Sequence, residues 1–211
     1  MDHRQRLRAR TAEEIVDSAE ALVLARDPAA VTVADIAKGL GMTAGALYRY
    51  FPSRDAILAR VQARCLRSLA LALDEVPAGE PVPWLLALAG AFVGWSRREP
   101  GRYHLLARML ATPEPLVDGA ALDEVLPGAV AVLRPLHLAL ARSGLVAPEA
   151  VPGCAFAFFT ALHGALQVDK LARFVPAASG PRVARTSAEA LLLGWGAPPS
   201  LVTASPAWEI A

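Results

Sequence analysis

Residues 32–51 read TVADIAKGLGMTAGALYRYF, and this stretch decides how the N-terminal part of the chain folds. Two short helical patterns lie on either side of Gly41. Each contains an apolar pair four residues apart, Ile36 with Leu40 and Leu47 with Phe51. Residues at this spacing share one face of a helix, so both pairs are expected to point inward. Two helices joined by so short a turn, with an apolar seam between them, form a helix-turn-helix unit.

Local signals define the ends of both helices. Thr32 is placed to cap the first helix, and Asp35 at the third helical position makes a short acidic version of the capping box. Gly41 suits the left-handed conformation that ends a helix and turns the chain sharply. Thr43 is expected to cap the second helix, which we expect to end by Phe51-Pro52 because a residue before proline is disfavoured in the α region.

The side chains that remain on the outside of the second helix carry no acid. From Ile36 to Arg54 there are three basic residues and no acidic one, and the first ten residues hold four arginines against one aspartate. The whole chain is almost neutral, with 21 basic and 20 acidic residues, so this bias is local. A solvated surface helix usually mixes both signs. The pattern therefore favours a phosphate-bearing partner, double-stranded DNA.

Each outward residue type has a use against a duplex. The small residues 44–46 let the helix backbone approach base edges, and tyrosine hydroxyls can bind phosphates. Arg49 can bind guanine in a bidentate way, which contributes about 1–3 kcal/mol of discrimination. Arg54 is predicted to reach a backbone phosphate. The predicted DNA-contacting residues are Thr32, Lys38, Thr43, Ala44, Gly45, Tyr48, Arg49, Tyr50 and Arg54. The alternative is that Tyr48 and Tyr50 are packing residues of an ordinary helical hairpin.

The segment TVADIAKGLGMTAGALYRYFPSRDAIL resembles the DNA-binding segment of the tetracycline-repressor (TetR) family of bacterial transcription regulators. The family pattern is filled by Thr32, Ile36, Ala37, Leu40, Gly41, Gly45, Leu47, Tyr48 and Phe51. Met42, Thr43 and Tyr50 replace the Val, Ser and His of the pattern. The tyrosine keeps a ring with a polar tip but loses any charge. The motif covers the first quarter of the chain, and the rest resembles the family only in its layout.

The remaining sequence predicts an all-α fold, since apolar residues recur at three- and four-residue intervals between Pro- and Gly-containing breaks. We expect a first helix over about 6–24 and later helices over 53–76, 83–98, 101–111, 120–143, 148–175 and 181–195. Residues 1–52 are expected to form a three-helix DNA-binding domain. Residues 53–196 would form a helical ligand-binding and dimerisation domain, and residues 197–211 an irregular tail.

The resemblance implies that the second domain binds a small molecule and a second copy of the chain. Large apolar side chains with few polar groups between them suit a mostly apolar ligand. The residues predicted to line such a pocket are Trp84, Phe92, Trp95, Tyr103, Met109, Phe159, His163 and Gln167. An aromatic stripe at helical spacing is also typical of plain core, and His163 fits a core or interface histidine better than a ligand contact. The residues predicted for the dimer interface are Gly164, Leu171, Ala184, Ala188, Leu191, Leu192 and Trp195.

The function that the resemblance implies is a cytoplasmic homodimeric repressor, which leaves a palindromic operator when a small, mostly apolar effector binds. The long helix from Ser53 would link the two activities. An alternative is a helix-turn-helix regulator without a small-molecule effector, controlled by a protein partner or acting as an activator.

Other classes of protein find little support in the sequence. No HExxH, GxSxG, phosphate-binding glycine loop or Cys/His cluster is present, so we expect neither an enzyme nor a metal or cofactor site. Cys65 and Cys154 are expected to stay reduced, and a redox role has only Arg64 beside Cys65 as a hint. The apolar runs 84–95 and 154–168 are shorter than the roughly 20 residues that span a bilayer, and the arginine-rich start has no apolar stretch after it, so we expect no secretory signal and no membrane partner.

Overall fold

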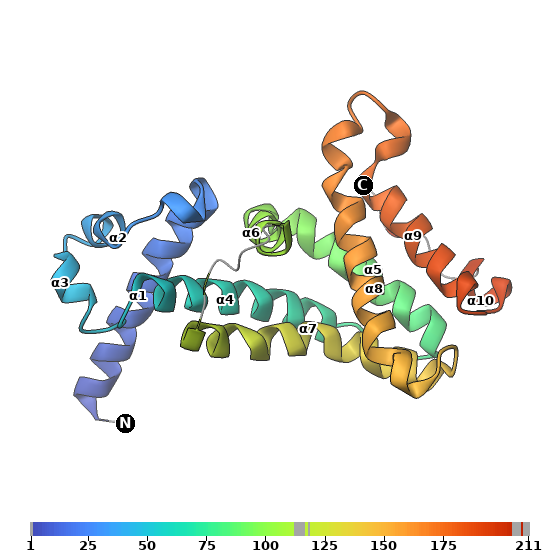
Figure 1. Ribbon diagram of the computed structural model, residues 1–211, viewed down its shortest axis with the longest axis horizontal. Helices are drawn as coiled ribbons and strands as arrows, with labels where there is room; N and C mark the ends of the chain where they lie inside the picture. Colours follow the sequence, from blue (N-terminus) through green and yellow to red (C-terminus); the bar gives the residue numbers. More distant parts are fainter. Residues whose placement is uncertain (1, 112–116, 118, 204–207, 209–211) are drawn as a thin grey trace. The chain divides into compact units, whose positions relative to one another are not determined.

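A computed structural model describes residues 2–111, 117, 119–203 and 208 of the chain, and these residues form α-helices and short 3-10 turns with no strand. The predicted all-α class is confirmed. The helices are α1 His3–Ala25, α2 Val33–Gly39, α3 Ala44–Leu47, α4 Arg54–Asp74, α5 Pro81–Arg98, α6 Pro100–Ala111, α7 Leu122–Ser143, α8 Val151–Gln167, α9 Gly180–Gly194 and α10 Pro199–Thr203 (Figure 1).

The chain divides into two compact units. Unit 1 comprises residues 1–67 and 100–129, and unit 2 comprises residues 68–99 and 130–211. Helices α4 and α7 each begin in unit 1 and end in unit 2. The boundary between compact units therefore lies inside α4, whereas the sequence suggested a functional boundary at residue 52, which stays a prediction.

In unit 1, α1 packs against α2 and α6, and α2 packs against α3. The approach of α1 to α2 depends on Gly39, because a Cβ atom there would lie 2.9 Å from the hydroxyl oxygen of Ser18. That hydroxyl donates to the carbonyl oxygen of Ile36 at 3.4 Å. The two helices therefore pack closely at Gly39, and this hydrogen bond joins them.

A network of ion pairs joins several helices of unit 1 around the buried side chain of Glu20. Its carboxylate accepts from Arg64 of α4 at 2.9 Å and from Arg102 of α6 at 2.8 Å. Burial opposes the charge of Arg64, but hydrogen bonds to Glu20, Asp17 and Glu13 outweigh that effect and raise the pKa of the guanidinium above its ordinary value. A buried carboxylate needs such partners, because an unpaired charge in the interior costs several kcal/mol or more.

Unit 2 has an aromatic core. The ring of Phe92 lies 6.3 Å from that of Trp95 and 5.4 Å from that of Phe159, measured between centroids. Phe158 contacts Trp195 at 6.3 Å, and the indole nitrogen of Trp95 donates to Ser68 at 3.1 Å. Aromatic pairs in tilted or offset arrangements contribute about 0.5–1.5 kcal/mol beyond the area they bury.

Three expected elements differ from the structure. The α-helical part of α3 ends at Leu47, and the chain continues to Phe51 through tight turns, with Tyr50 N–H donating to the Leu47 carbonyl at 2.8 Å. The helix expected over 148–175 is regular only over 151–167, with 3-10 turns at 148–150, 169–171 and 176–178.

The tail expected to be irregular contains α10. Trp208 lies against α5, where a Cβ atom on Gly90 would come within 2.9 Å of its ring. The other residues of the expected tail beyond 203 lie outside the described part of the chain.

Two helical segments, Gly119–Ser143 and Pro148–Leu171, are long and apolar enough to cross a membrane by length and composition alone. This differs from the expectation drawn from the shorter runs 84–95 and 154–168. The second segment includes α8, whose Phe158 and Leu162 are buried in unit 2, and a packed core helix passes the same test.

Candidate nucleic-acid interface

The two helices α2 and α3 are fixed at their ends by the residues that the sequence singled out. The Thr32 hydroxyl accepts from Asp35 N–H at 3.1 Å, and Asp35 in turn accepts from Thr32 N–H at 3.0 Å. Hydrogen bonds from the Thr32 side chain and backbone, with help from Arg26, lower the pKa of the Asp35 carboxyl. Gly41 has φ of 64°, and Thr43 Oγ1 accepts from Ala46 N–H at 3.2 Å. The predicted caps and turn are confirmed.

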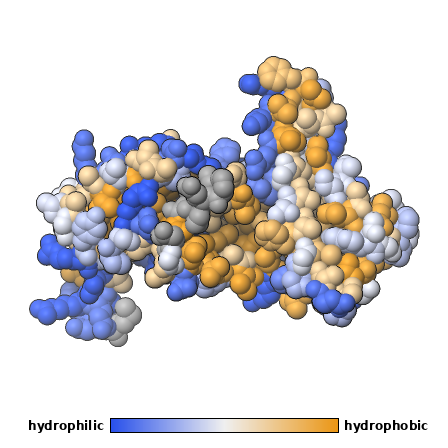
Figure 2. Space-filling view, in the orientation of Figure 1, coloured by the Kyte–Doolittle hydropathy of each residue, from blue (hydrophilic) through white to orange (hydrophobic). Residues whose placement is uncertain are grey.

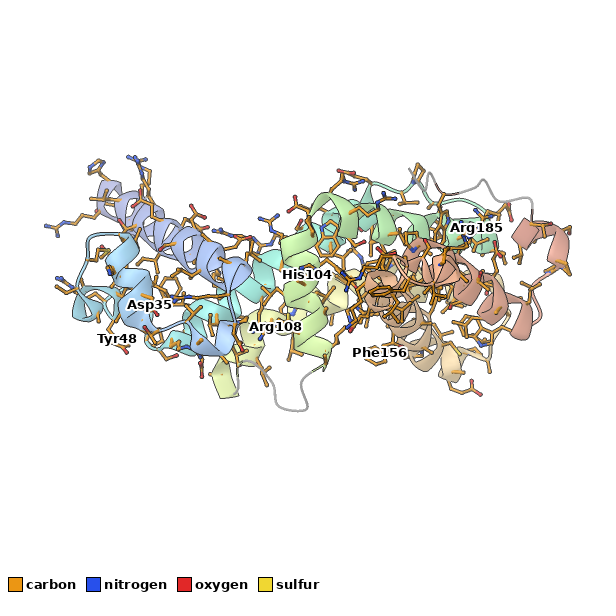
Figure 3. The ribbon with its side chains drawn as sticks, turned by 90° about the horizontal axis from the view of Figure 1, so that it is seen from above. Asp35, Tyr48, His104, Arg108, Phe156 and Arg185 are labelled. Atoms are coloured by element: carbon orange, nitrogen blue, oxygen red, sulfur yellow. The ribbon has the colours of Figure 1, made fainter. Side chains whose placement is uncertain are left out.

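Burial sets the orientation of α3. Leu47 is fully buried, as predicted, and Phe51 is half-buried. On the other side of the helix, Thr43 and Gly45 are exposed, and Tyr48 exposes 53% of its surface (Figure 3). Four further residues were expected to face outward. Of these, Lys38 and Arg49 are exposed, and Ala44 and Tyr50 are half-buried. The outer face therefore carries small side chains, the hydroxyls of Thr43, Tyr48 and Tyr50, and cations, without an acid.

The start of α1 lies beside this face. The Arg8 side chain donates to the carbonyl oxygen of Arg49 at 3.0 Å, which brings an arginine-rich helix end to the C-terminal end of α3. Arg4, Arg6 and Arg8 are all exposed. The sequence suggested a basic N-terminus, but only the fold shows that it shares a surface with α3. No hydrogen bond or ion pair of the Arg49 guanidinium occurs among the described residues.

Arg54 has a different role from the one predicted. Its side chain turns inward and donates to the carbonyl oxygens of Val31 and Pro28, each at 2.6 Å, and of Ala29 at 3.2 Å. These bonds tie the connection between α1 and α2 to the start of α4. The hydroxyl and the backbone amide of Thr32 are likewise used inside the capping box. We therefore correct the assignment of Arg54 as a phosphate ligand and treat both residues as structural.

The residues predicted to line a ligand pocket lie in two separate units. Trp84, Phe92, Trp95, Phe159 and His163 are buried in unit 2, whereas Tyr103 and Met109 belong to unit 1. The structure thus gathers the aromatic members of α5 and α8 and leaves out the two on α6. The exposed Gln167 amide donates to Nε2 of His163 at 2.8 Å. Burial lowers the pKa of His163, so the ring is neutral at pH 7.

The prediction for the dimer interface is wrong for its central residues. Ala184, Ala188 and Leu192 are fully buried within the same chain, where α9 packs against α8 and α5. Small side chains serve this packing because they allow the helix axes to come close. Leu191 and Trp195 are half-buried, while Gly164 and Leu171 are exposed.

A cavity of about 620 Å³ lies at the junction of α7 and α8, and it shares no residue with the predicted pocket. It is lined by His137, Leu138, Ala141, Gly144, Leu145, Val146, Ala147, Pro148, Val151 and Pro152. No group of three His, Cys, Asp or Glu side chains that could hold a metal occurs among the residues that the structure describes. Cys65 and Cys154 are both free thiols, and Cys65 donates to the Arg102 carbonyl at 3.2 Å.

The arrangement of α1, α2 and α3, with the second helix of the pair presented outward after a sharp glycine turn, defines a helix-turn-helix protein. Comparison with known proteins agrees with this class. The tetR family of bacterial regulatory proteins matches residues 15–61. The chain is similar to an uncharacterized HTH-type transcriptional regulator found in two strains of Mycobacterium tuberculosis, with 33% identity over 112 residues. The matched region is 51% of this chain and 52% of the length of those relatives. The chain therefore spans about half the length of the relatives it matches.

Solved structures extend the similarity beyond the motif. SCO4313, a candidate regulatory protein, has a TM-score of 0.70 and 26% identity, covering 90% of this chain and 99% of that one. RolR, solved in complex with its ligand resorcinol, has a TM-score of 0.58 and 23% identity, covering 98% and 100%. Residues 15–61 thus match the DNA-binding segment of the tetR family of bacterial regulatory proteins.

Proposed function

We propose that this chain is a cytoplasmic homodimeric transcriptional repressor, which binds a palindromic DNA operator and is released by a small, mostly apolar ligand. One observation supports the DNA-binding part of this proposal. Leu47 is buried, so the opposite side of α3 is presented to solvent with Tyr48 and Arg49 exposed and no acid nearby. The surface we assign to DNA consists of Lys38, Thr43, Ala44, Gly45, Tyr48, Arg49 and Tyr50, together with the exposed arginines of α1.

These residues divide into two roles. The Arg49 guanidinium is able to reach a guanine edge in the major groove, because it lacks an internal partner among the described residues and small residues precede it on α3. Tyr48 and the arginines at the start of α1 bind phosphates, which position the helix without reading sequence. The Arg8 contact to the Arg49 carbonyl couples the two sets, so the phosphate contacts hold the reading residue in place.

The test is a binding assay with DNA selected from a random pool. Arg49→Ala is expected to relax preference at one position of each half-site and to reduce affinity for the selected DNA about 5- to 150-fold, equivalent to 1–3 kcal/mol. Tyr48→Ala is expected to weaken binding to all sequences alike. The exposed Arg182 of α9 is the matched control, and Arg182→Ala should leave affinity unchanged. Unaltered binding by both Arg49→Ala and Tyr48→Ala would contradict the proposed surface.

Two copies are required for a palindromic site, because one short helix reads only a few base pairs and a two-fold dimer doubles the contacts. The corrected candidate for the dimer surface is the exposed side of α8, which includes Phe156 and Gly164. Sedimentation analysis of the purified chain measures the stoichiometry directly.

The effector is assigned to unit 2 by chemistry. Its interior is formed by packed aromatic rings with a neutral histidine among them, an environment that suits a small aromatic molecule with few polar groups. The structural neighbour RolR has resorcinol as its ligand. Helix α4 continues from unit 1 into unit 2 and provides the link by which ligand and DNA binding affect one another, with a coupling of about 1–3 kcal/mol.

Tryptophan fluorescence tests the effector. All four tryptophans, Trp84, Trp95, Trp195 and Trp208, belong to unit 2. A panel of small phenols should therefore include compounds that change the fluorescence and weaken operator binding in the same concentration range. A panel that changes neither would favour a regulator that is controlled by a protein partner.

A further inference from the structure

A notch on helix α5 holds the half-buried ring of Trp208. Gly90 lies in the interior of α5, and a Cβ atom built on it would lie 2.9 Å from Cδ1, 3.1 Å from Nε1 and 3.3 Å from Cγ of Trp208. The five-membered edge of the indole thus faces the bare backbone of Gly90. Because any side chain at this position would meet the ring, the missing side chain is what makes the notch.

Arg185 of α9 forms the second wall of the notch (Figure 3). Its guanidinium carbon lies 5.9 Å from the centroid of the Trp208 ring, within the range of a cation–π contact. The Nε atom of Arg185 donates to Glu189, one turn later on the same helix, at 2.7 Å. This ion pair holds the guanidinium in place, so the wall is ready to receive a flat aromatic group.

Gly90 serves the ring of Trp208 rather than the packing of α5 on another helix. Glycine inside a helix is less stable than alanine, so a glycine there needs a compensating contact. The three atoms nearest to the missing side chain all belong to Trp208. At Gly128 of α7, by contrast, a Cβ atom would meet the side chain of Leu66 on α4 at 2.9 Å, which is contact between helices.

The surface around the notch has no broad apolar patch on the face shown in Figure 2, where α9 and α10 mix hydrophobic and hydrophilic residues. The exposed leucines there include Leu193 and Leu201. Helix α10 packs against both α5 and α9, and Trp208 follows its last residue by five positions. The tail therefore begins beside the notch, and recognition depends on the ring that enters it.

We propose that the notch between Gly90 and Arg185 is a binding site for indole-type aromatic molecules, and that the chain's own Trp208 occupies it as a tethered competitor. A free molecule of this class binds by displacing the ring of the tail. The site is separate from the aromatic interior to which the effector is assigned above, and it requires neither the operator nor that effector.

Tethering determines how strongly a free ligand binds. A group joined to its site by a short linker competes at an effective concentration in the millimolar range. The apparent affinity of a free ligand is reduced by the fraction of time that the site is open. Removing the Trp208 ring should therefore tighten binding of a free indole about 10-fold, which corresponds to a notch that is open about one-tenth of the time.

The experiment titrates full-length chains with 5-fluoroindole and follows the probe by fluorine NMR. Trp208→Ala should bind it about 10-fold more tightly than the unsubstituted chain. Adding Gly90→Ala should abolish this gain, because the new methyl group takes the place of the ring, while the helix itself favours alanine.

The second wall is tested in the Trp208→Ala chain. Arg185→Ala should weaken binding of the probe about 2- to 5-fold through loss of the cation–π contact. The exposed Arg182 of the same helix is the matched control, and Arg182→Ala should leave binding unchanged.

Binding of the probe to the aromatic interior of unit 2 would be equal in all these chains, so it is separated from binding at the notch. Equal affinity of the unsubstituted chain and Trp208→Ala would overturn the proposal, and so would a gain that persists after Gly90→Ala. A repressor that no phenol releases from DNA would contradict the effector assignment and leave this result unchanged.

Discussion

The two units are stabilised by different kinds of contact. In unit 1, the helices are joined by charge and by bonds to the backbone: Glu20 lies between two arginines, and Arg54 donates to three carbonyl oxygens. In unit 2, rings from α5 and α8 pack on one another. Contacts of the first kind depend on salt and protonation, and those of the second kind depend on shape. A change of salt concentration should therefore alter the stability of unit 1 more than the stability of unit 2.

The largest effect is expected in the aromatic core. Phe92→Ala removes a ring that contacts Trp95 and Phe159, and we expect it to lower the free energy of unfolding by about 3–5 kcal/mol, with little dependence on salt. Urea unfolding followed by tryptophan fluorescence reports unit 2 directly. Leu71→Ala, at an exposed position, should cost less than about 1 kcal/mol in the same assay. A similar cost for both substitutions would contradict the packing described.

A smaller, salt-dependent effect is expected in unit 1. Glu20→Gln replaces the carboxylate between Arg64 and Arg102 by a neutral amide, while Asp17 and Glu13 still contact Arg64. We expect a loss of about 1–3 kcal/mol at low salt. Thermal unfolding followed by circular dichroism at two salt concentrations measures it. The control is Glu14→Gln, since Glu14 forms an exposed pair with Arg10 worth at most about 0.5 kcal/mol. A loss that does not change with salt would show that the network acts by packing.

The sequence predicted features that depend on neighbours along the chain. Thr32, Gly41 and Thr43 act within four residues of themselves, so their capping roles could be derived without the fold. The four-residue spacing of Leu47 and Phe51 likewise predicted that Leu47 is buried. The family resemblance then supplied the orientation of the whole motif, because the motif residues are the ones that keep α2 and α3 together.

Features that depend on distant neighbours were missed. Arg54 was expected to contact a backbone phosphate because it lies at the start of the next helix, but its bonds go to residues more than twenty positions earlier. The sequence correctly predicted a closely packed helix face formed by Ala184, Ala188 and Leu192. The sequence does not state whether the partner of such a face is the same chain or another, and here it is α8 and α5 of the same chain.

One buried histidine makes the stability of unit 2 depend on pH as well. Burial lowers the pKa of His163 below its ordinary value of about 6.5. As the pH falls, His163 is therefore protonated in the unfolded chain before it is protonated in the folded chain, which favours unfolding. Stability of unit 2 should therefore fall as pH drops below about 6.5, by at most about 1.4 kcal/mol per pH unit from this group. Urea unfolding at pH 7.5 and 5.5 tests this, and His163→Phe, which cannot titrate, should reduce the difference. An unchanged difference would assign the effect to other groups.

The smallest effect concerns the cap of α3. The Thr43 hydroxyl accepts from Ala46 N–H, and α3 has only four residues, so little else holds its first turn. Thr43→Ala should cost about 1 kcal/mol of stability, whereas Thr43→Ser keeps the oxygen and should cost less. Hydrogen exchange of the Ala46 amide measures the local opening. Because the cap orients the outer face of α3, Thr43→Ala should weaken DNA binding beyond what Thr43→Ser does, and equal binding by both would mean that the hydroxyl neither orders the helix nor touches the duplex.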